Sequence, residues 1–500
     1  MSLHPTTGTV LDTAYTHNAY PEMFPRALAT VLALQGRASR LDAIDSGFDY
    51  CDLGCGNGLG CNVMAAANPQ GRFTGIDLNP VHIANARRLA AEGGLSNVTF
   101  VEASFAAVAE GPSFDVIALH GVYSWVGPAQ RAEIVTLLKN RLRPGGVVYV
   151  SYNLLPGWAE LMPLRRLMVE QTAGLDLPSL DKAMLARDFL QRIAALDLGY
   201  FAEPGRPAGF VAKLGKDSLD YLVHEYLNAD WQPHYSADVA AELAEAGLVP
   251  AGDATLAENL LPLLLPPEAQ DFIAAAPTPR AARTRRDFLA NRAFCRDVFV
   301  KGEALGASLD DKRFAALQGP VAPGEVPMPI GPVPLSEAAR ASVAACAAAP
   351  QLGREIADLP LLLAAGLVEP ATLDALPATE GIEQAEAIAL SPFNRAVCRA
   401  AFAGQRTAYL AAPVTGATHG LGWIEAGLLL AWAEAGFAAA PHRCAEAVLA
   451  ANRRLFGQGR ALDGLDEHAA YLRRGLEIFR QSHLRRLVLN GAVSCPVIPA

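Results

Sequence analysis

Apolar and polar positions along the first 155 residues follow two periods. Short apolar runs that predict buried strands are separated by longer segments whose apolar positions recur with helical spacing. Asn79 and Pro80 are typical of a helix start, and Gly93 and Gly94 of its end. Five strands are predicted. The first leads into a glycine-rich segment at Gly54 and the second ends at Asp77, and the others cover 98–101, 114–119 and 147–151. This alternation predicts an α/β fold with an open parallel sheet.

Beyond residue 160 the pattern becomes mainly helical. Helical periodicity covers 161–174, 183–198 and 237–246, and an arginine-rich helix is predicted at 280–296. Glycines and prolines predict a connector at 200–215, and six prolines predict a linker at 320–334. The apolar segment 420–440 contains Glu425 and Glu434, so it predicts a buried helix and not a membrane span.

The glycine-rich segment joins the first strand to the first helix. Glycine stands at every second position from Gly54 to Gly60, whereas the dinucleotide fingerprint requires glycine where this chain has Leu59. Asp52 lies at the mouth of the loop, where a carboxylate would repel a pyrophosphate but attract a ligand carrying an ammonium and a sulfonium. Asp77 ends the next strand, where a carboxylate can accept two ribose hydroxyls. These features predict a site for S-adenosylmethionine.

This Asp-x-Gly-x-Gly-x-Gly loop, with Asp77 placed 25 residues after Asp52, resembles motif I and the following acid of class I methyltransferases. The turn from Arg143 to Gly146 before the fifth strand is similar as well. The resemblance implies a Rossmann-like sheet. At one position the chain departs from the family, because Ser104 stands where these enzymes often place an Asp for the adenine amino group, and a hydroxyl is a weaker acceptor. The cofactor-binding residues implied within the sheet are Asp52, Gly54, Cys55, Gly56, Gly58, Asp77, Leu78, Ala103, Ser104, Phe105, His120 and Gly121.

Composition narrows the remaining possibilities. A chain of 500 residues is too long for one core, so two or three domains are expected. The net charge of -10 disfavours nucleic acid as a partner, since nonspecific binding needs a basic face. The eight cysteines include no Cys-x-x-Cys pair and no histidine partners at zinc spacing, which predicts a reducing environment and no metal site. The N-terminus lacks the basic and apolar regions of a signal peptide, so a cytoplasmic location is expected.

Aromatic residues are concentrated after the fourth and fifth strands. These segments begin at the carboxyl ends of parallel strands, where ligands of open sheets bind. Aromatic faces attract cations, so such rings can hold a lysine ammonium near the methyl group, or they only pack the loops. The aromatic residues of the two segments are Tyr123, Trp125, Tyr152 and Trp158. The candidate catalytic residues are His120, Tyr123, Trp125 and Tyr152.

His120 is the predicted proton acceptor, because an unperturbed imidazole has a pKa near 6.5. A hydrogen bond from His120 to the cofactor or to its own loop is the alternative, and water can also take the proton. The N-terminal segment adds Tyr15 and Tyr20 ahead of a helix predicted at 24–34. Either these two rings cover the methionine end of the cofactor, or they form a hydrophobic clasp on the edge of the domain.

Three further segments carry a closer resemblance: His120 to Trp125, Ser151 to Trp158, and Tyr221-Leu-Val-His-Glu-Tyr-Leu227. They are similar to bacterial methyltransferases that carry a methyltransferase regulatory domain, among them rickettsial-type protein-lysine methyltransferases that modify outer-membrane proteins. The resemblance implies a SAM-binding catalytic domain at 1–160, followed by a helical insertion and regulatory domain at 161–320. The linker and the alanine- and leucine-rich pattern after it predict a C-terminal helical domain at 321–500, with a winged-helix-like region near 409–422.

The function predicted from the sequence is N-methylation of lysine side chains in a protein substrate. Two alternatives stay open: an O- or N-methyltransferase of a biosynthetic pathway that takes a small molecule, and a non-catalytic SAM-binding scaffold. The C-terminal half shows no catalytic constellation, so it is assigned to substrate selection or to formation of a homodimer.

Overall fold

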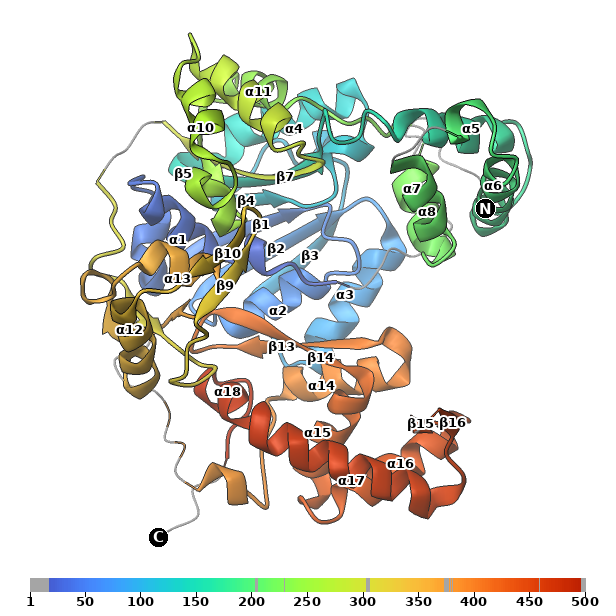
Figure 1. The fold of residues 1–500 in the computed structure, drawn as a ribbon, viewed down its shortest axis with the longest axis vertical. Coiled ribbons are helices and arrows are strands. Elements are labelled where there is room, and N and C mark those ends of the chain that lie inside the picture. The colour runs from blue at the N-terminus through green and yellow to red at the C-terminus, as the bar shows by residue number, and fades with distance from the viewer. Residues whose placement is uncertain are drawn as a thin grey trace.

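The computed structural model describes residues 18–202, 206–228, 230–302, 306–372, 377, 379, 381–457 and 459–495. Its centre is a seven-stranded sheet in the order β3-β2-β1-β4-β5-β7-β6 (Figure 1). Neighbouring strands are parallel except that β7 is antiparallel to both β5 and β6. The strands are β1 (Phe48–Leu53), β2 (Gly71–Asp77), β3 (Val98–Glu102), β4 (Phe114–Leu119), β5 (Leu142–Asn153), β6 (Leu248–Asp253) and β7 (Phe294–Lys301).

Alternate residues of the central strands enter separate cores on the two faces of the sheet. Tyr50 and Tyr149 belong to one core, whereas Cys51 and Val148 belong to the other. The first core is shared with α1 (Pro25–Leu34), α2 (Leu59–Ala67) and α3 (Pro80–Glu92). The second is shared with α4 (Pro128–Arg141) and α9 (Ser236–Ala244). The sheet with helices on both faces confirms the predicted Rossmann-like fold.

Strands β6 and β7 complete this sheet although they come from residues 248–301. The sheet therefore extends past the boundary that the sequence suggested near residue 160. Helices α10 (Pro267–Ala274) and α11 (Pro279–Leu289) stand between the two strands in the chain. Arg283 of α11 and Arg292 pair with Asp297 and Asp253 of the sheet, so these arginines join buried ion pairs.

A bundle of four helices is inserted between β5 and α9 and has its own apolar core. The predicted connector at 200–215 is wrong, because α7 occupies much of it. Pro207 falls in the first turn of α7, where a missing N–H costs no helical hydrogen bond, and burial of Phe210 and Leu214 supports the helix. The bundle consists of α5 (Met162–Thr172), α6 (Ser179–Ala194), α7 (Arg206–Leu214) and α8 (Leu219–Tyr226).

The prediction of a linker at 320–334 is also wrong. A hairpin of β9 (Glu325–Met328) and β10 (Gly331–Pro334) occupies it, with Pro327 opposite Pro332. A two-stranded hairpin has only edge strands, so prolines can be accommodated there without interrupting a central ladder. Around it lie β8 (Arg313–Ala315), α12 (Glu337–Ala348), β11 (Gln351–Leu352), α13 (Leu359–Ala364) and β12 (Glu369–Pro370).

The C-terminal region is mainly helical and packs beneath α2 and α3 (Figure 1). Asn68 at the end of α2 donates to the carbonyl of Gly416 at 3.2 Å. No helix in the described part of the chain has both the length and the apolar character needed to cross a membrane. The elements are α14 (Pro392–Ala400), β13 (Thr407–Ala412), β14 (Ala417–Gly422), α15 (Trp423–Ala435), α16 (Ala440–Ala450), β15 (Phe456–Gly457), β16 (Arg460–Ala461), α17 (Gly464–Ser482) and α18 (Leu484–Leu489).

Candidate functional site

The loop from β1 to α2 is held against the end of β2. The N–H groups of Gly54 and Cys55 both donate to the carbonyl of Ile76, at 2.7 and 3.0 Å. The N–H of Gly56 donates to Asp77 Oδ2 at 2.9 Å, and the N–H of Asn79 donates to Asp77 Oδ1 at 2.8 Å. His82 Nδ1 also lies 3.2 Å from Asp77 Oδ1. A carboxylate has about four acceptor positions, so Asp77 keeps capacity for at least one further donor after it has ordered the loop.

Two glycines of the loop serve different purposes. Gly56 has φ +54° and a Cβ added there would meet nothing within 4 Å, so its backbone borders open space. Gly58 has φ +69° and its Cβ would lie 2.3 Å from the Cβ of Ala86 on α3. Gly56 therefore leaves room for a ligand, whereas Gly58 allows α2 and α3 to approach each other. Gly58, predicted to bind cofactor, lines neither of the cavities described below.

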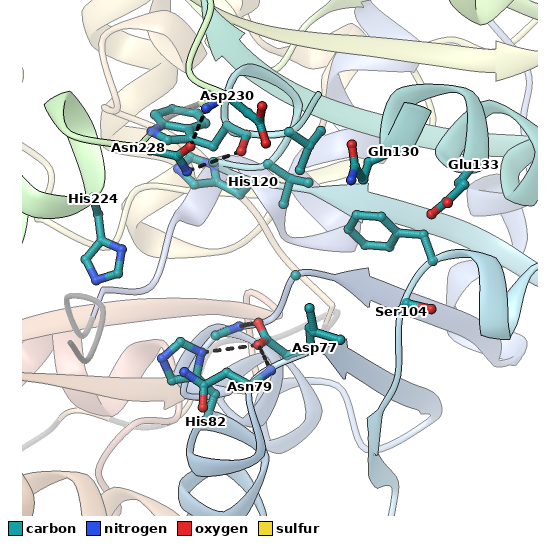
Figure 2. A pocket seen from close by; sticks show the side chains of 18 of the residues that line it. Asp77, Asn79, His82, Ser104, His120, Gln130, Glu133, His224, Asn228 and Asp230 are labelled. Carbon is teal, nitrogen blue, oxygen red and sulfur yellow. Dashed lines mark hydrogen bonds and ion pairs between the residues drawn. The ribbon is translucent and has the colours of Figure 1, made fainter. Parts of the chain in front are cut away.

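The main cavity has a volume of about 400 Å³ and lies at the carboxyl ends of β1, β2 and β4 (Figure 2). This is within the range of small-molecule sites. Among the sequence-predicted residues it is lined by Gly54, Gly56, Asp77, Leu78, Ala103, Ser104, Phe105, His120, Gly121 and Trp125. Ser104 is exposed, and its Oγ accepts from the N–H of Ala107 at 3.3 Å.

A small cavity of about 60 Å³ adjoins the main one and shares Gly54, Gly56 and His120 with it. It adds Tyr20, Asp52 and Cys55 from the predicted set. Burial, reinforced by the charge of Asp77, raises the pKa of Asp52 to about 7. A cation bound in this small cavity would favour the ionised carboxylate and reverse that shift.

His120 is fixed between two tyrosines. Its ring stacks on Tyr20 with a centroid separation of 3.6 Å, and its Nδ1 hydrogen-bonds the hydroxyl of Tyr149 at 2.8 Å. Burial, with a smaller contribution from Arg296, lowers the pKa of His120 to about 3. The imidazole is neutral at physiological pH but too weakly basic to take a proton efficiently. The structure therefore favours the alternative role, a hydrogen-bonding and stacking group at the end of β4.

Two predicted catalytic tyrosines do not reach either cavity. Tyr123 and Tyr152 are completely buried, with their hydroxyls donating to Glu242 and Asp297. Their predicted position beside the methyl group is wrong, because each ring has turned into the core behind the loops. Trp158 is also buried and packs against Trp231 at a centroid distance of 4.9 Å. Of the four loop aromatics, Trp125 alone lines the main cavity, and Tyr15 lies outside the described residues.

One wall of the main cavity is formed by residues that the sequence did not predict to be part of the site. His224, Asn228 and Asp230 come from α8 and the turn that follows it, more than a hundred residues after the glycine loop (Figure 2). Asn228 Nδ2 donates to the carbonyl of Trp125 at 3.2 Å, and the N–H of Asp230 donates to Asn228 Oδ1 at 2.9 Å. The motif around His224 carries the family resemblance, but its spacing does not indicate which of its side chains face a cavity. The other lining residues that were not predicted are Asn79, His82, Val122, Val126, Gln130 and Glu133.

The linings of the two cavities contain acidic side chains. Asp77, Glu133 and Asp230 line the main cavity, and Asp52 lines the small one. Within the described part of the chain, neither lining includes a lysine or an arginine. Such a site favours ligands with positive charge and disfavours anionic ones.

Comparison with known proteins agrees with this geometry. Residues 44–174 match the family described as "Methyltransferase domain", and residues 218–301 match the "Predicted methyltransferase regulatory domain". Residues 44–174 are therefore similar to methyltransferase domains, and residues 218–301 are similar to the regulatory domain that accompanies such domains. The second match includes α8, β6 and β7, so the regulatory region contributes both a cavity wall and two strands of the sheet.

Two curated relatives are uncharacterised proteins. One, from Synechocystis sp., is 37% identical over 298 residues, which cover 59% of this chain and 58% of that protein. The other, from Rickettsia prowazekii, is 27% identical over 300 residues, covering 58% of this chain and 53% of that protein. The chain thus spans little more than half the length of these relatives. PKMT2 from Rickettsia typhi in complex with AdoHcy has the same fold, with a TM-score of 0.70 at 18% identity over 95% of this chain and 99% of that one.

Proposed function

We propose that the protein is an S-adenosylmethionine-dependent methyltransferase that methylates lysine side chains of a protein substrate. The observation that carries the substrate class is the charge of the cavity lining, which includes acids but no lysine or arginine among its described residues. A lysine arrives as a cation and is attracted to such a site. The fold of PKMT2, a protein lysine methyltransferase, supports the same assignment.

The residues present fit the cofactor. Asp77 would hold the ribose, Gly54 and Gly56 would allow close backbone approach, and Asp52 would face the ammonium. S-adenosylmethionine supplies an electrophilic methyl group when it is bound. Tyr20, stacked on His120, would narrow the space beside that group and exclude water. The chain would thus act mainly by orienting a neutral amine and keeping the site dry.

A small-molecule acceptor remains the second candidate because of a local match. Trans-aconitate 2-methyltransferase from Methylobacterium nodulans is 31% identical over 100 residues, which cover 20% of this chain and 36% of that enzyme. A polycarboxylate acceptor would, however, be repelled by the acids that line this cavity. The charge of the site therefore supports lysine over an anionic small molecule.

The experiment is transfer of labelled methyl groups from S-adenosylmethionine into size-fractionated bacterial lysate, with Asp77→Ala as the matched control. The expected result is label in the protein fraction that is recovered as methyl-lysine after acid hydrolysis and is lost with the control. Label found only in the low-molecular-weight fraction would support the small-molecule alternative. Cofactor binding without transfer to any fraction would support the scaffold.

A further inference from the structure

The wall formed by α8 contains a buried acid that the proposed cofactor site does not use. His224 and Asn228 line the main cavity (Figure 2). Glu225 directly follows His224 in α8 and lies about one helical turn after Tyr221. Glu225 is only 7% exposed. Its carboxylate therefore lies within the wall that His224 and Asn228 form, and not on the cavity surface.

Glu225 is connected to the sheet through Asn153, the last residue of β5. Asn153 Nδ2 donates to Glu225 Oε1 at 3.2 Å. The backbone of Asn153 is fixed as well, since its N–H donates to Ser124 Oγ at 2.9 Å and its carbonyl accepts from the N–H of His234 at 2.9 Å. The carboxylate is thus positioned at the carboxyl edge of the sheet by a rigid neighbour, at the edge where ligands of such sheets bind.

No cation neutralises this acid at contact distance. Within the described residues, no lysine, arginine or histidine lies within 4.0 Å of the Glu225 carboxylate as an ion-pair partner. Burial raises the pKa of Glu225 to about 7, and Asn153 and the more distant Lys213 only partly offset it. A buried carboxylate with one amide donor is costly to keep, and an arriving cation would remove much of that cost.

The acid also interacts electrostatically with Tyr20, in the N-terminal segment. The charge of Glu225 acts on the hydroxyl of Tyr20 and raises its pKa, although burial contributes more. Tyr20 in turn stacks on His120 and lines the small cavity. Glu225 is therefore close enough to Tyr20, which lines the small cavity, for its charge to act on that residue.

We propose that Glu225, positioned by Asn153, is the anionic partner of the cationic nitrogen of the methyl acceptor. The inference rests on the proposed function and names the residue that selects a cationic acceptor. It also assigns a task to the regulatory domain, which supplies the acid while the class I domain supplies the cofactor site. Glu225 is a positioning and selectivity residue in this scheme.

Cofactor analogues test this without a protein substrate. Sinefungin carries an amine on the carbon that replaces the sulfonium and methyl group of S-adenosylmethionine, so it places a cation where the acceptor meets the methyl group. AdoHcy has no charge there. Calorimetry on the full-length chain would give the ratio of the two affinities for the wild type, Glu225→Gln, Glu225→Asp and Asp217→Asn. Asp217 is the matched control, because it precedes α8 and acts on Glu225 electrostatically but is not bonded to Asn153.

The expected result is that Glu225→Gln lowers the preference for sinefungin at least fivefold with AdoHcy affinity within twofold of the wild type. Asp217→Asn should keep the wild-type preference for sinefungin, and Glu225→Asp should retain part of it. The aspartate variant also tests the inference if the glutamine variant does not fold. An unchanged ratio in both Glu225 variants, with AdoHcy still bound, would overturn this inference and leave the proposed function standing. Failure of the wild type to bind either ligand would overturn both.

Discussion

Asp77→Asn is the most informative single change at the cofactor site. It keeps the size of the side chain but removes its charge and replaces one acceptor oxygen with an NH₂ group. In the structure the two carboxylate oxygens accept backbone N–H groups from Gly56 and Asn79 at 2.9 and 2.8 Å. The asparagine can accept only through its one oxygen, so one of these N–H groups would face an NH₂ donor instead.

Asp77→Asn is expected to reduce both the stability of the protein and its affinity for AdoHcy. Breaking one backbone hydrogen bond should lower the free energy of unfolding by about 1 kcal/mol. The ribose hydroxyls would lose a charged acceptor, and hydrogen bonds to charged groups contribute about 1.5–3 kcal/mol each without full additivity. AdoHcy affinity should therefore fall by about 2–4 kcal/mol, which corresponds to roughly 30- to 900-fold in Kd.

Calorimetry with AdoHcy and with its 2′,3′-dideoxy analogue measures the contribution of the ribose hydroxyls to affinity. The wild type should bind the dideoxy analogue much more weakly than AdoHcy, whereas Asp77→Asn should bind both with similar affinity. Thermal unfolding of the ligand-free variant checks that the loop is still formed. A variant that loses less than threefold in AdoHcy affinity, or that still discriminates between the two ligands as the wild type does, would refute the placement of the ribose at Asp77.

Three further predictions follow from the loop and the core behind it. Because the pKa of ligand-free Asp52 is about 7 and the ammonium of the ligand needs the ionised carboxylate, AdoHcy should bind about tenfold more weakly at pH 6 than at pH 8, and calorimetry on Asp52→Asn should show a flat profile. Gly58→Ala should lower the free energy of unfolding by about 2–4 kcal/mol in urea titrations, because its Cβ would lie 2.3 Å from Ala86 at φ +69°, whereas Gly56→Ala should mainly weaken AdoHcy binding. Tyr152→Phe should reduce stability by about 1–3 kcal/mol through the lost bond to Asp297 and leave AdoHcy affinity within twofold, and a large loss of affinity with unchanged stability would contradict its assignment to the core.

Local sequence signals determined the cofactor half of the site. The glycine loop, the acid at the end of β2 and the ends of β3 and β4 are each specified within a few residues by strand patterning and turn chemistry. Parallel strands bring their carboxyl ends to one edge, so predicting the strands was enough to bring Gly56, Asp77, Ser104 and His120 around one cavity. The helices α1 and α3 were predicted for the same local reason, and α3 begins with the predicted first-turn proline, Pro80.

Only the tertiary structure decided the acceptor half. Whether an aromatic ring after a strand faces the cavity or the core depends on what packs behind it. Tyr123 and Tyr152 are buried in the core, where their hydroxyls donate to Glu242 and Asp297. The low pKa of His120 follows from burial under Tyr20, which no motif encodes. Glu225 meets Asn153 across 72 residues because the inserted helical bundle returns α8 to the end of β5. Sequence patterns report a residue's neighbours along the chain, whereas the environment of an acceptor site is set by neighbours that only folding brings together.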